Sequence, residues 1–506
     1  MRYFVAWGAL LALGIPTHAA EPLILVGIQK QLLVDDYVIA QKVGVSRVLG
    51  QVKKVGVVLE PTLPTDFKQR NPDGTAKFDS FGYRTTVLYN DHARKFQMWY
   101  TPGDSRLGVG YAESADGLKW AQPLVSRDGR SNLVLQDEAK EFSCSIDTTV
   151  PWGAADKFKG AGDSLLVPGS EVGLWHSADG LRWTAYNQGR PVTGRAADTA
   201  NQILWDAAKK AHRLRTRTDL GATGGRGEVR GTRIMLHGGN LDRDPTAWKA
   251  VSNTIQVNVP RQEKMAGPNS IPRLQMEALT CWVYEGVYFG LMNVLTVGPL
   301  TGAETGAGAE LDHQTRHEGD VIDAYIGISR DGLKFDQTWI QQRRPLVPRG
   351  PAGAFDMDMI QIASQVVTCG DEHWLYYAGF DERHHSRGHR GKIALAKLPI
   401  DRFAGLAAGD KPGSFTTKPF RLDGARIEVN VDAPDGTVQV EVLDAEGLPI
   451  PALSGPARLR AVNGLRTPLE WKSGQAALKD TVGRTVRLRF ELHRAAIYAF
   501  QVISDP

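Results

Sequence analysis

The chain has 506 residues, of which 42% are hydrophobic and 23% charged, and its formal net charge is +4. This length exceeds one compact core and predicts two or three domains. The nearly neutral charge and the lack of a long Lys/Arg run exclude a basic stripe for nucleic acid.

The first 20 residues predict a secretory signal peptide. Arg2 precedes an apolar run from Tyr3 to Ile15, and small residues follow at Ala19 and Ala20. A basic residue, a short apolar run and small residues in this order are typical of such signals. The run is too short to span a bilayer. We therefore expect a secreted or periplasmic protein with no membrane span.

A turn motif recurs between residues 114 and 403. It reads Ser114-Ala-Asp-Gly-Leu-Lys-Trp120, Ser177-Ala-Asp-Gly-Leu-Arg-Trp183 and Ser329-Arg-Asp-Gly-Leu-Lys-Phe335, each after a strand-like run. Ser and Asp side chains bond turn amides, and glycine supplies a positive φ. The closing aromatic residue is expected to pack on its neighbours as an anchor.

Two weaker copies, closing at Trp248 and Phe403, extend the series to five. The closing aromatic positions are 63, 65, 87 and 68 residues apart, and the long interval contains a Gly-rich insertion at 298–320. Units of this length fit four-stranded blades. The repeat therefore predicts an all-β fold whose residues 21–406 form a five-bladed β-propeller.

The C-terminal part changes character after a linker near 404–413. Clean alternation of apolar and polar residues occurs in 426–431, 437–443, 485–492 and 496–502, between turn signals such as Pro434-Asp-Gly. Such short alternating strands predict a separate β-sandwich at 413–506.

Each propeller unit offers an acidic residue where its innermost strand is expected. The residues are Asp79, Asp147, Asp198, Glu277 and either Asp356 or Asp358. Glycoside hydrolysis needs one protonated carboxyl as acid and one carboxylate as base or nucleophile. We expect Glu277 to be the general acid and Asp79 the base or nucleophile. Asp147 and Asp198 are expected to orient the substrate or raise the pKa of the acid.

Four further residues are expected to bind a carbohydrate substrate: Arg84, Arg217, Asp356 and Trp282. Guanidinium groups bind sugar hydroxyls or carboxylates, and a tryptophan stacks on a sugar face. Trp99, Trp205 and Trp374 are alternatives to Trp282.

We expect no cofactor and no metal site. The three cysteines match no zinc spacing and allow at most one disulfide. His384, His385 and His389, like His313 and His317, are typical of solvated loops. No phosphate loop, dinucleotide fingerprint or nucleophile elbow occurs.

With these motifs in view, the chain resembles a family of secreted bacterial proteins, frequent in planctomycetes, that is similar to the invertase and fructanase family (glycoside hydrolase family 32). The matching segments are Leu33-Val-Asp-Asp-Tyr, the Ser-x-Asp-Gly-x-x-Trp turns, Tyr284-Glu-Gly-Val-Tyr-Phe-Gly-Leu, Phe355-Asp, Trp374-Leu-Tyr-Tyr-Ala-Gly-Phe and Leu488-Arg-Phe-Glu-Leu. The resemblance implies a propeller, a sandwich and a glycosidase-like activity.

The chain departs from that family at its catalytic motifs. The Asn-Asp-Pro tripeptide is absent, Arg243-Asp-Pro stands beside a closing turn, and Glu277 with Cys281 only loosely matches the Glu-Cys motif. Fructan specificity is therefore not carried over. The Ser-x-Asp-Gly turns also resemble the Asp-boxes of sialidases, so a sialidase-like hydrolase is an alternative. Another is a non-catalytic glycan-binding propeller.

Overall fold

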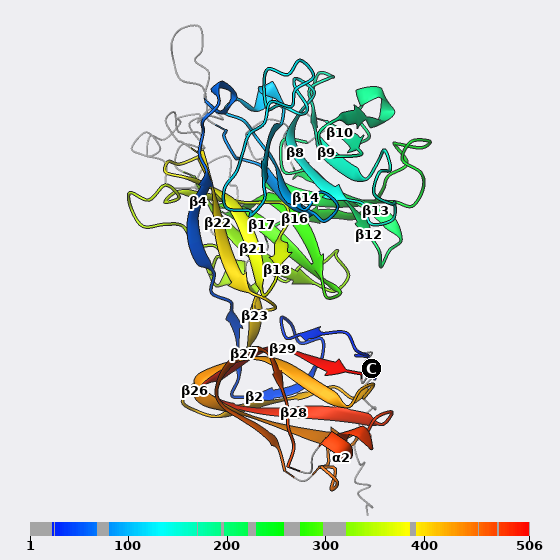
Figure 1. Ribbon diagram of the computed structural model, residues 1–506, viewed down its shortest axis with the longest axis vertical. Coiled ribbons are helices and arrows are strands. Elements are labelled where there is room, and N and C mark those ends of the chain that lie inside the picture. Colours follow the sequence, from blue (N-terminus) through cyan, green and yellow to red (C-terminus); the bar gives the residue numbers. More distant parts are fainter. Residues whose placement is uncertain are drawn as a thin grey trace, which may run out of the picture. The chain divides into compact units, whose positions relative to one another are not determined.

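The computed structural model describes residues 23–24, 26–67, 80–169, 171–193, 197–220, 229–257, 274–296, 320–384, 391–453, 455–472 and 475–504. These residues are nearly all in strands and turns, with a few short helices (Figure 1). The chain divides into two compact units. The smaller comprises residues 1–46 and 406–506, and the larger comprises 47–405. The expected signal peptide at 1–20 lies outside the described residues.

The first three sheets of the larger unit are antiparallel and follow one another along the chain. The first consists of β5 (Thr85–Asn90), β6 (Lys95–Tyr100) and β7 (Gly110–Ser114). The second consists of β8 (Ala139–Ile146), β9 (Phe158–Ser164), β10 (Val172–Ser177) and β11 (Trp183–Ala185). The third consists of β12 (Gln202–Asp206), β13 (Ala211–Leu220), β14 (Val229–His237) and β15 (Lys249–Ile255).

The last sheet of the larger unit has two halves joined by one parallel pair, Ile322 with Met359. The first half is β16 (Leu274–Tyr284), β17 (Val287–Thr296) and β18 (Val321–Ser329). The second is β19 (Met359–Ile362), β20 (Val367–Cys369), β21 (Glu372–Phe380), β22 (Gly391–Pro399) and β4 (Lys53–Leu59). The connecting segments carry η1 (Pro64–Asp66), η2 (Ser105–Leu107), η3 (Tyr186–Gly189) and α1 (Thr338–Gln341).

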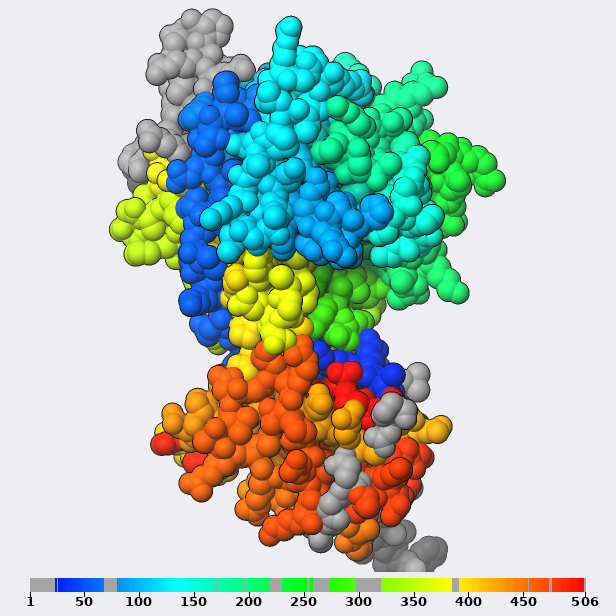
Figure 2. All heavy atoms as spheres, viewed as in Figure 1, coloured from blue at the N-terminus to red at the C-terminus, as the bar shows by residue number. Residues whose placement is uncertain are grey.

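The sheets contact one another in chain order. The neighbouring pairs are β5 with β8, β8 with β12, β14 with β16, β17 with β19, and β21 with β5. The last pair returns the order to its start. In addition, β4 pairs with β22, so a strand from before the first sheet completes the last one, as the blue segment beside the yellow strands shows (Figures 1 and 2).

The repeated turns form as the sequence predicts. In the copy at 177–183, Ser177 Oγ accepts from Gly180 N at 2.9 Å, and Asp179 Oδ1 accepts from Leu181 N at 2.8 Å. Trp183 Nε1 closes the turn by donating to Gly180 O at 2.9 Å. The Ser and Asp bonds recur in the copies that begin at Ser114 and Ser329. The turn chemistry is therefore confirmed.

The turn glycines also fasten neighbouring sheets together, which local sequence did not predict. Trp99 Nε1 of the first sheet donates to Gly180 O of the second at 2.8 Å. Tyr376 Oη donates to Gly117 O at 2.8 Å, and Arg213 Nη1 to Gly332 O at 2.9 Å. Each carbonyl therefore accepts a bond from an adjacent sheet.

We expect Gly180→Ala to lower the free energy of unfolding of the larger unit by about 3 kcal/mol, because it adds a clash to backbone strain. The φ of Gly180 is 80°, and a Cβ atom would lie 2.5 Å from Trp99 Cζ2. Gly153→Ala is the matched control, since its φ is 88° and a Cβ meets nothing within 4 Å. It should cost about 1 kcal/mol. Urea unfolding measures both, and equal losses would contradict the sheet-fastening role.

The smaller unit is built around a bent strand, β26 (Arg426–Asp444). Its first half pairs with β29 (Ala495–Ile503) and its second half with β28 (Thr485–His493). The other elements are β1 (Gln31–Leu32), β2 (Ile39–Val43), β24 (Gly413–Thr417), β25 (Phe420–Arg421), β27 (Ala457–Pro468) and α2 (Gln475–Lys479), with β3 (Ser46–Leu49) and β23 (Ala404–Ala408) at the boundary. The predicted alternating segments are strands, and their apolar residues form one core.

The N-terminal segment joins the smaller unit rather than the larger one. We expected the propeller to begin at residue 21, but β1 pairs with β29 and β2 pairs with β24. Leu33 and Val38 are fully buried in the core of the smaller unit. The difference arises because alternation identifies a strand without identifying the sheet with which it pairs.

Within the described parts of the chain, no helix is long and apolar enough to cross a bilayer. Cys144, Cys281 and Cys369 are all free thiols, so the one disulfide that the sequence allowed is not formed.

Candidate active site

Charged side chains from several sheets meet where the first strands of those sheets begin. Arg84 directly precedes β5, Glu141 is the third residue of β8, and Glu277 is the fourth residue of β16. Arg84 Nε donates to Glu141 Oε2 at 2.7 Å, and Arg84 Nη2 donates to Glu277 Oε1 at 3.0 Å. One guanidinium therefore holds two carboxyl groups from two different sheets.

Three more side chains complete this cluster. Arg230 of β14 donates to Glu277 Oε2, and Tyr83 Oη donates to Glu277 Oε1 at 3.3 Å. Gln361 of β19 accepts from Arg84 Nη1 at 2.8 Å. Both carboxyl groups are buried, with 8% of Glu141 and 5% of Glu277 exposed. The cluster is therefore dry enough for its electrostatic interactions to be strong.

Backbone contacts fix the two carboxyl-bearing residues. The ladder between β8 and β9 shifts register between Lys140 and Ser143, and Glu141 within this bulge has a φ of 50°. Such strained positions occur often at functional sites. Asn201 Nδ2 donates to Glu141 O at 3.3 Å, and Thr199 Oγ1 donates to Glu277 O at 2.8 Å. The segment before β12 therefore ties both acids together.

The pKa values of the two carboxyl groups are displaced in opposite directions. Burial raises the pKa of Glu141 to about 7, against the lowering influence of Arg84. Burial also raises the pKa of Glu277, but Arg230 and Arg84 outweigh it and hold that pKa well below its usual range. Near neutral pH, Glu141 can carry a proton while Glu277 stays ionised.

A rim of charged residues lies beside this cluster. Lys140 Nζ is 3.1 Å from Asp163 Oδ2 and 3.7 Å from Asp198 Oδ1. Arg217 Nη1 is 3.7 Å from Asp198 Oδ2 and donates to Asp198 O at 3.1 Å. Asp198 is 62% exposed, and its charge contributes to the raised pKa of Glu141. Asp198 therefore gives the buried pair an accessible neighbour.

Four of the predicted site residues come together here: Arg84, Arg217, Asp198 and Glu277. Asp79 lies outside the described residues, so its catalytic role stays a prediction. His313, His317, His385 and His389 lie outside them as well, so their expected place in solvated loops also stays a prediction.

The role expected for Glu277, that of general acid, does not fit its surroundings. A carboxylate that accepts from two arginines and a tyrosine is ionised and cannot serve as the proton donor.

Asp147 does not reach the cluster. It follows β8 six residues after Glu141, which places it about 20 Å away along the strand. Its carboxylate binds Lys159 Nζ at 2.8 Å and accepts from Thr149 N at 2.8 Å. Burial raises its pKa, but these bonds outweigh it and lower the pKa below the usual value. The contacts of Asp147 are therefore those of a turn and an ion pair, and the fold does not bring it to the cluster.

Asp356 and Trp282 also have structural surroundings. Asp356 is buried, binds Lys54 Nζ at 2.5 Å and accepts from Tyr377 Oη at 3.0 Å. Trp282 stacks on Tyr284 at 4.9 Å between ring centroids and follows Glu277 by five residues, or about 16 Å of strand. Neither side chain contacts the cluster, because an ion pair with Lys54 holds Asp356 and aromatic packing holds Trp282. The alternative tryptophans Trp99 and Trp374 are buried in the cores of their sheets.

Sequence reasoning missed Glu141, Arg230 and Tyr83. It also expected His384 in a solvated loop, which is wrong, because His384 is buried and its ring centroid lies 6.2 Å from that of Tyr83. A signal for Glu141 exists, since residues 141, 143, 145 and 147 are polar and the intervening residues are Phe142, Cys144 and Ile146. This alternation of polar and apolar residues leads back from Asp147 to Glu141, although the bulge between Lys140 and Ser143 interrupts the regular strand there. We find no comparable local signal for Arg230 or Tyr83.

The raised pKa of Glu141 predicts a pH-dependent stability. Its ordinary value is 4.5 and its folded value about 7, so the folded state holds an extra proton between these values. The stabilisation is complete below pH 4.5 and is lost as pH rises to about 7, a change of about 3 kcal/mol. We expect Glu141→Gln to remove this fall.

Urea unfolding at several pH values measures the effect as a difference between wild type and variant. The comparison is needed because burial lowers the pKa of His212 to about 4, which contributes the opposite slope over part of the same range. Parallel pH curves for the two proteins would contradict the raised pKa of Glu141.

Among the described residues, no group of three His, Cys, Asp or Glu side chains is arranged to hold a metal ion. The functional groups of the cluster are carboxyl, guanidinium, phenol and amide. Their chemistry is proton transfer, nucleophilic attack and the binding of hydroxyl or carboxylate groups.

Comparisons with known proteins yield likenesses in structure alone. No family model matches the chain, and no curated protein matches its sequence. Among solved structures, an N-acetylgalactosamine deacetylase from F. plautii is 14% identical over 70% of this chain and 96% of its own, with a TM-score of 0.42.

Two other structures are similarly remote. A glycosyl hydrolase from Bacteroides ovatus is 13% identical over 70% of this chain and 95% of its own, with a TM-score of 0.42. The Bombyx mori GH32 beta-fructofuranosidase is 13% identical over 89% of this chain and 94% of its own, with a TM-score of 0.39. Because these structures are less than 25% identical to this chain and have TM-scores below 0.5, they assign no activity or substrate to it.

Proposed function

We propose that this chain is a secreted or periplasmic glycoside hydrolase. In this proposal the larger unit is a five-bladed β-propeller and the smaller unit a β-sandwich. The contacts between sheets in chain order, which return from β21 to β5, support the propeller. The pairing of β4 with β22 supports its closure.

The observation that carries the proposal is the pair of carboxyl groups bound to Arg84. Glu141 and Glu277 share one guanidinium, yet the pKa of Glu141 is raised to about 7 and that of Glu277 is lowered. In glycosidases such as lysozyme, two neighbouring carboxyl groups with diverging pKa values act as the acid and the ionised partner. We assign the acid to Glu141 and the ionised partner to Glu277.

The reaction then has two steps. Glu141 gives its proton to the glycosidic oxygen as the bond from that oxygen to the anomeric carbon breaks, and a Glu277 oxygen bonds that carbon. Next, Glu141 takes a proton from water, the water oxygen attacks the same carbon, and Glu277 leaves as a carboxylate. Retaining glycosidases hold their two carboxyl groups about 5–5.5 Å apart. Because one guanidinium binds both Glu141 and Glu277, we propose the retaining course for this chain.

One observation favours the sialidase-like alternative. Tyr83 Oη lies 3.3 Å from Glu277, and sialidases use a tyrosine nucleophile. Against it, burial raises the pKa of Tyr83 well above its ordinary value, which disfavours the phenolate. Tyr83→Phe separates the two mechanisms, because it abolishes the first step only if the phenol is the nucleophile.

The proposed hydrolase should turn over a glycan, whereas the alternative, a non-catalytic glycan-binding propeller, should bind a glycan without cleaving it. A screen of the purified chain on a panel of aryl glycosides and polysaccharides, with product analysis, tests the proposal. We expect turnover with retained anomeric configuration. The control variant Asp356→Asn removes a buried acid outside the cluster, and it should lose at most a small part of the hydrolytic activity. Binding of a glycan without turnover would support the alternative.

A further inference from the structure

Three arginines share one face of β13, at positions 213, 215 and 217. The first and the last have carboxylate partners. Arg213 Nε donates to Asp206 Oδ2 at 2.9 Å, and Arg217 Nη1 is 3.7 Å from Asp198 Oδ2. Arg215 stands between them, and no carboxylate of the described residues pairs with it.

The side chain of Arg215 is fully buried and has one long hydrogen bond. Arg215 Nη1 donates to Gln202 Oε1 at 3.4 Å, and this amide oxygen already accepts from Cys281 N at 2.8 Å. Arg215 Nε and Nη2 have no hydrogen-bond partner among the described residues. These two N–H groups lie on one edge of the guanidinium, where they form a fork that suits a single acceptor group.

The neighbours of Arg215 do not neutralise its charge. Burial raises the pKa of the Cys281 thiol above its ordinary value, so this sulfur is uncharged near neutral pH. The ring centroid of Phe335 is 6.0 Å from Arg215 Cζ, at the limit of a cation–π contact. Burial lowers the pKa of Arg215 to about 10, and the guanidinium therefore stays charged at neutral pH.

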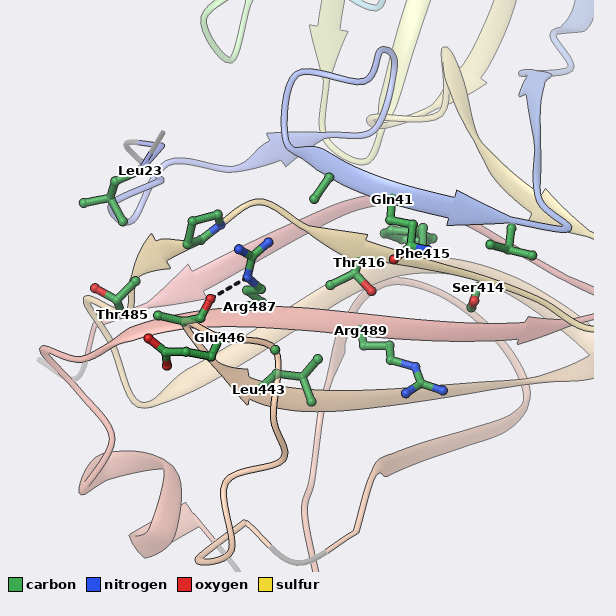
Figure 3. A pocket seen from close by; sticks show the side chains of 15 residues that line it. Leu23, Gln41, Ser414, Phe415, Thr416, Leu443, Glu446, Thr485, Arg487 and Arg489 are labelled. Atoms are coloured by element: carbon green, nitrogen blue, oxygen red, sulfur yellow. Dashed lines mark hydrogen bonds between the residues drawn. The ribbon is translucent and has the colours of Figure 1, made fainter. Parts of the chain in front are cut away.

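The arginines in a groove of the smaller unit show a different situation (Figure 3). Arg487 Nε donates to Ala445 O at 2.9 Å, the bond drawn there. Arg489 Nη2 donates to Glu491 Oε1 at 2.6 Å, and 45% of the Arg489 side chain is exposed. These cations are bonded and face solvent, so they call for no further partner, unlike the buried Arg215.

We propose that the Nε and Nη2 edge of Arg215 binds a chloride ion between β13 and β16, two strands that contact each other. One monovalent anion neutralises the single unpaired cation. A water molecule would satisfy the two N–H groups but would leave the charge buried without a counterion. The ion belongs to the packing of the larger unit and stabilises its folded state. The site is independent of the proposed hydrolase activity.

Urea unfolding of the full-length chain tests the inference, with sodium chloride exchanged against sodium gluconate at constant ionic strength. We expect the ratio of folded to unfolded larger unit to rise with chloride, by up to tenfold for each tenfold rise in its concentration. Arg215→Met should lose this dependence. In gluconate alone it should be no less stable than wild type, because it no longer buries an unpaired charge.

The matched control is Arg349→Met, which removes an arginine of the same unit whose Nε is 2.8 Å from Asp323 Oδ1. It should keep the chloride dependence of wild type. Equal stability of wild type in the two salts, or an unchanged chloride dependence in Arg215→Met, would overturn the inference.

Bromide gives a second measurement that needs no variant. Crystals of wild type grown in sodium bromide should show an anomalous scattering peak beside Arg215 Nε and Nη2. Ordinary water density at that place, without an anomalous signal, would refute the inference even if Arg215→Met fails to fold.

Discussion

Glu141→Gln is expected to lower kcat/KM by about 10²–10⁴-fold on glycosides with a poor leaving group, because the glutamine cannot donate a proton to the departing oxygen. The loss should shrink for dinitrophenyl glycosides, whose leaving group departs without protonation. Glu277→Gln should lose activity on both substrates, because the first step then lacks its nucleophile. Initial rates on a matched pair of aryl glycosides measure the difference.

The pH profile gives an independent readout of the same assignment. A general acid with a pKa of about 7 is active while protonated, so kcat/KM should fall as pH rises above 7. Glu277 has a pKa well below its usual range, so no matching fall is expected between pH 5 and 7. Equal losses of Glu141→Gln on all leaving groups would exclude the acid role.

Arg84→Met is expected to destabilise the larger unit by about 3 kcal/mol, because it removes one of the two buried cations that bind the ionised Glu277 and leaves that charge with Arg230 alone. The guanidinium is 5% exposed and bonds both carboxyl groups and Gln361. Denaturant unfolding measures the loss. The variant should also raise the pKa of Glu277, which shifts the pH dependence of stability.

Two further variants separate lost charge pairing from lost packing. Above pH 7, where Glu141 would otherwise ionise, Arg84→Met with Glu141→Gln should recover part of the stability, because one buried charge is gone. Lys392→Met breaks an ion pair with Glu60 whose side chains are 33% and 56% exposed, and it should cost less than about 1 kcal/mol. A double variant as unstable as the sum of its single variants would contradict the shared charge network.

Local sequence was sufficient for the repeated turns and for the strands of the C-terminal part. In the Ser177 turn, the hydroxyl, carboxylate and glycine needed for its geometry are within four residues of one another. In β28, alternation alone separates the buried Leu488 and Phe490 from the outward Arg487 and Arg489. These features depend on neighbours in the chain, so a single sequence contains the information that specifies them.

The amino-acid sequence by itself therefore determined the turns, the strands and the nature of the charged residues that begin them. Tertiary structure alone decided which of these residues meet. Arg84 joins Glu141 and Glu277 across separations of 57 and 193 residues, while Asp147 stays with Lys159 in its own sheet. The physical reason is that the contacts of each carboxyl group come from sheets that are distant in the sequence. These contacts bury the group and place charges beside it, and so they also set its pKa.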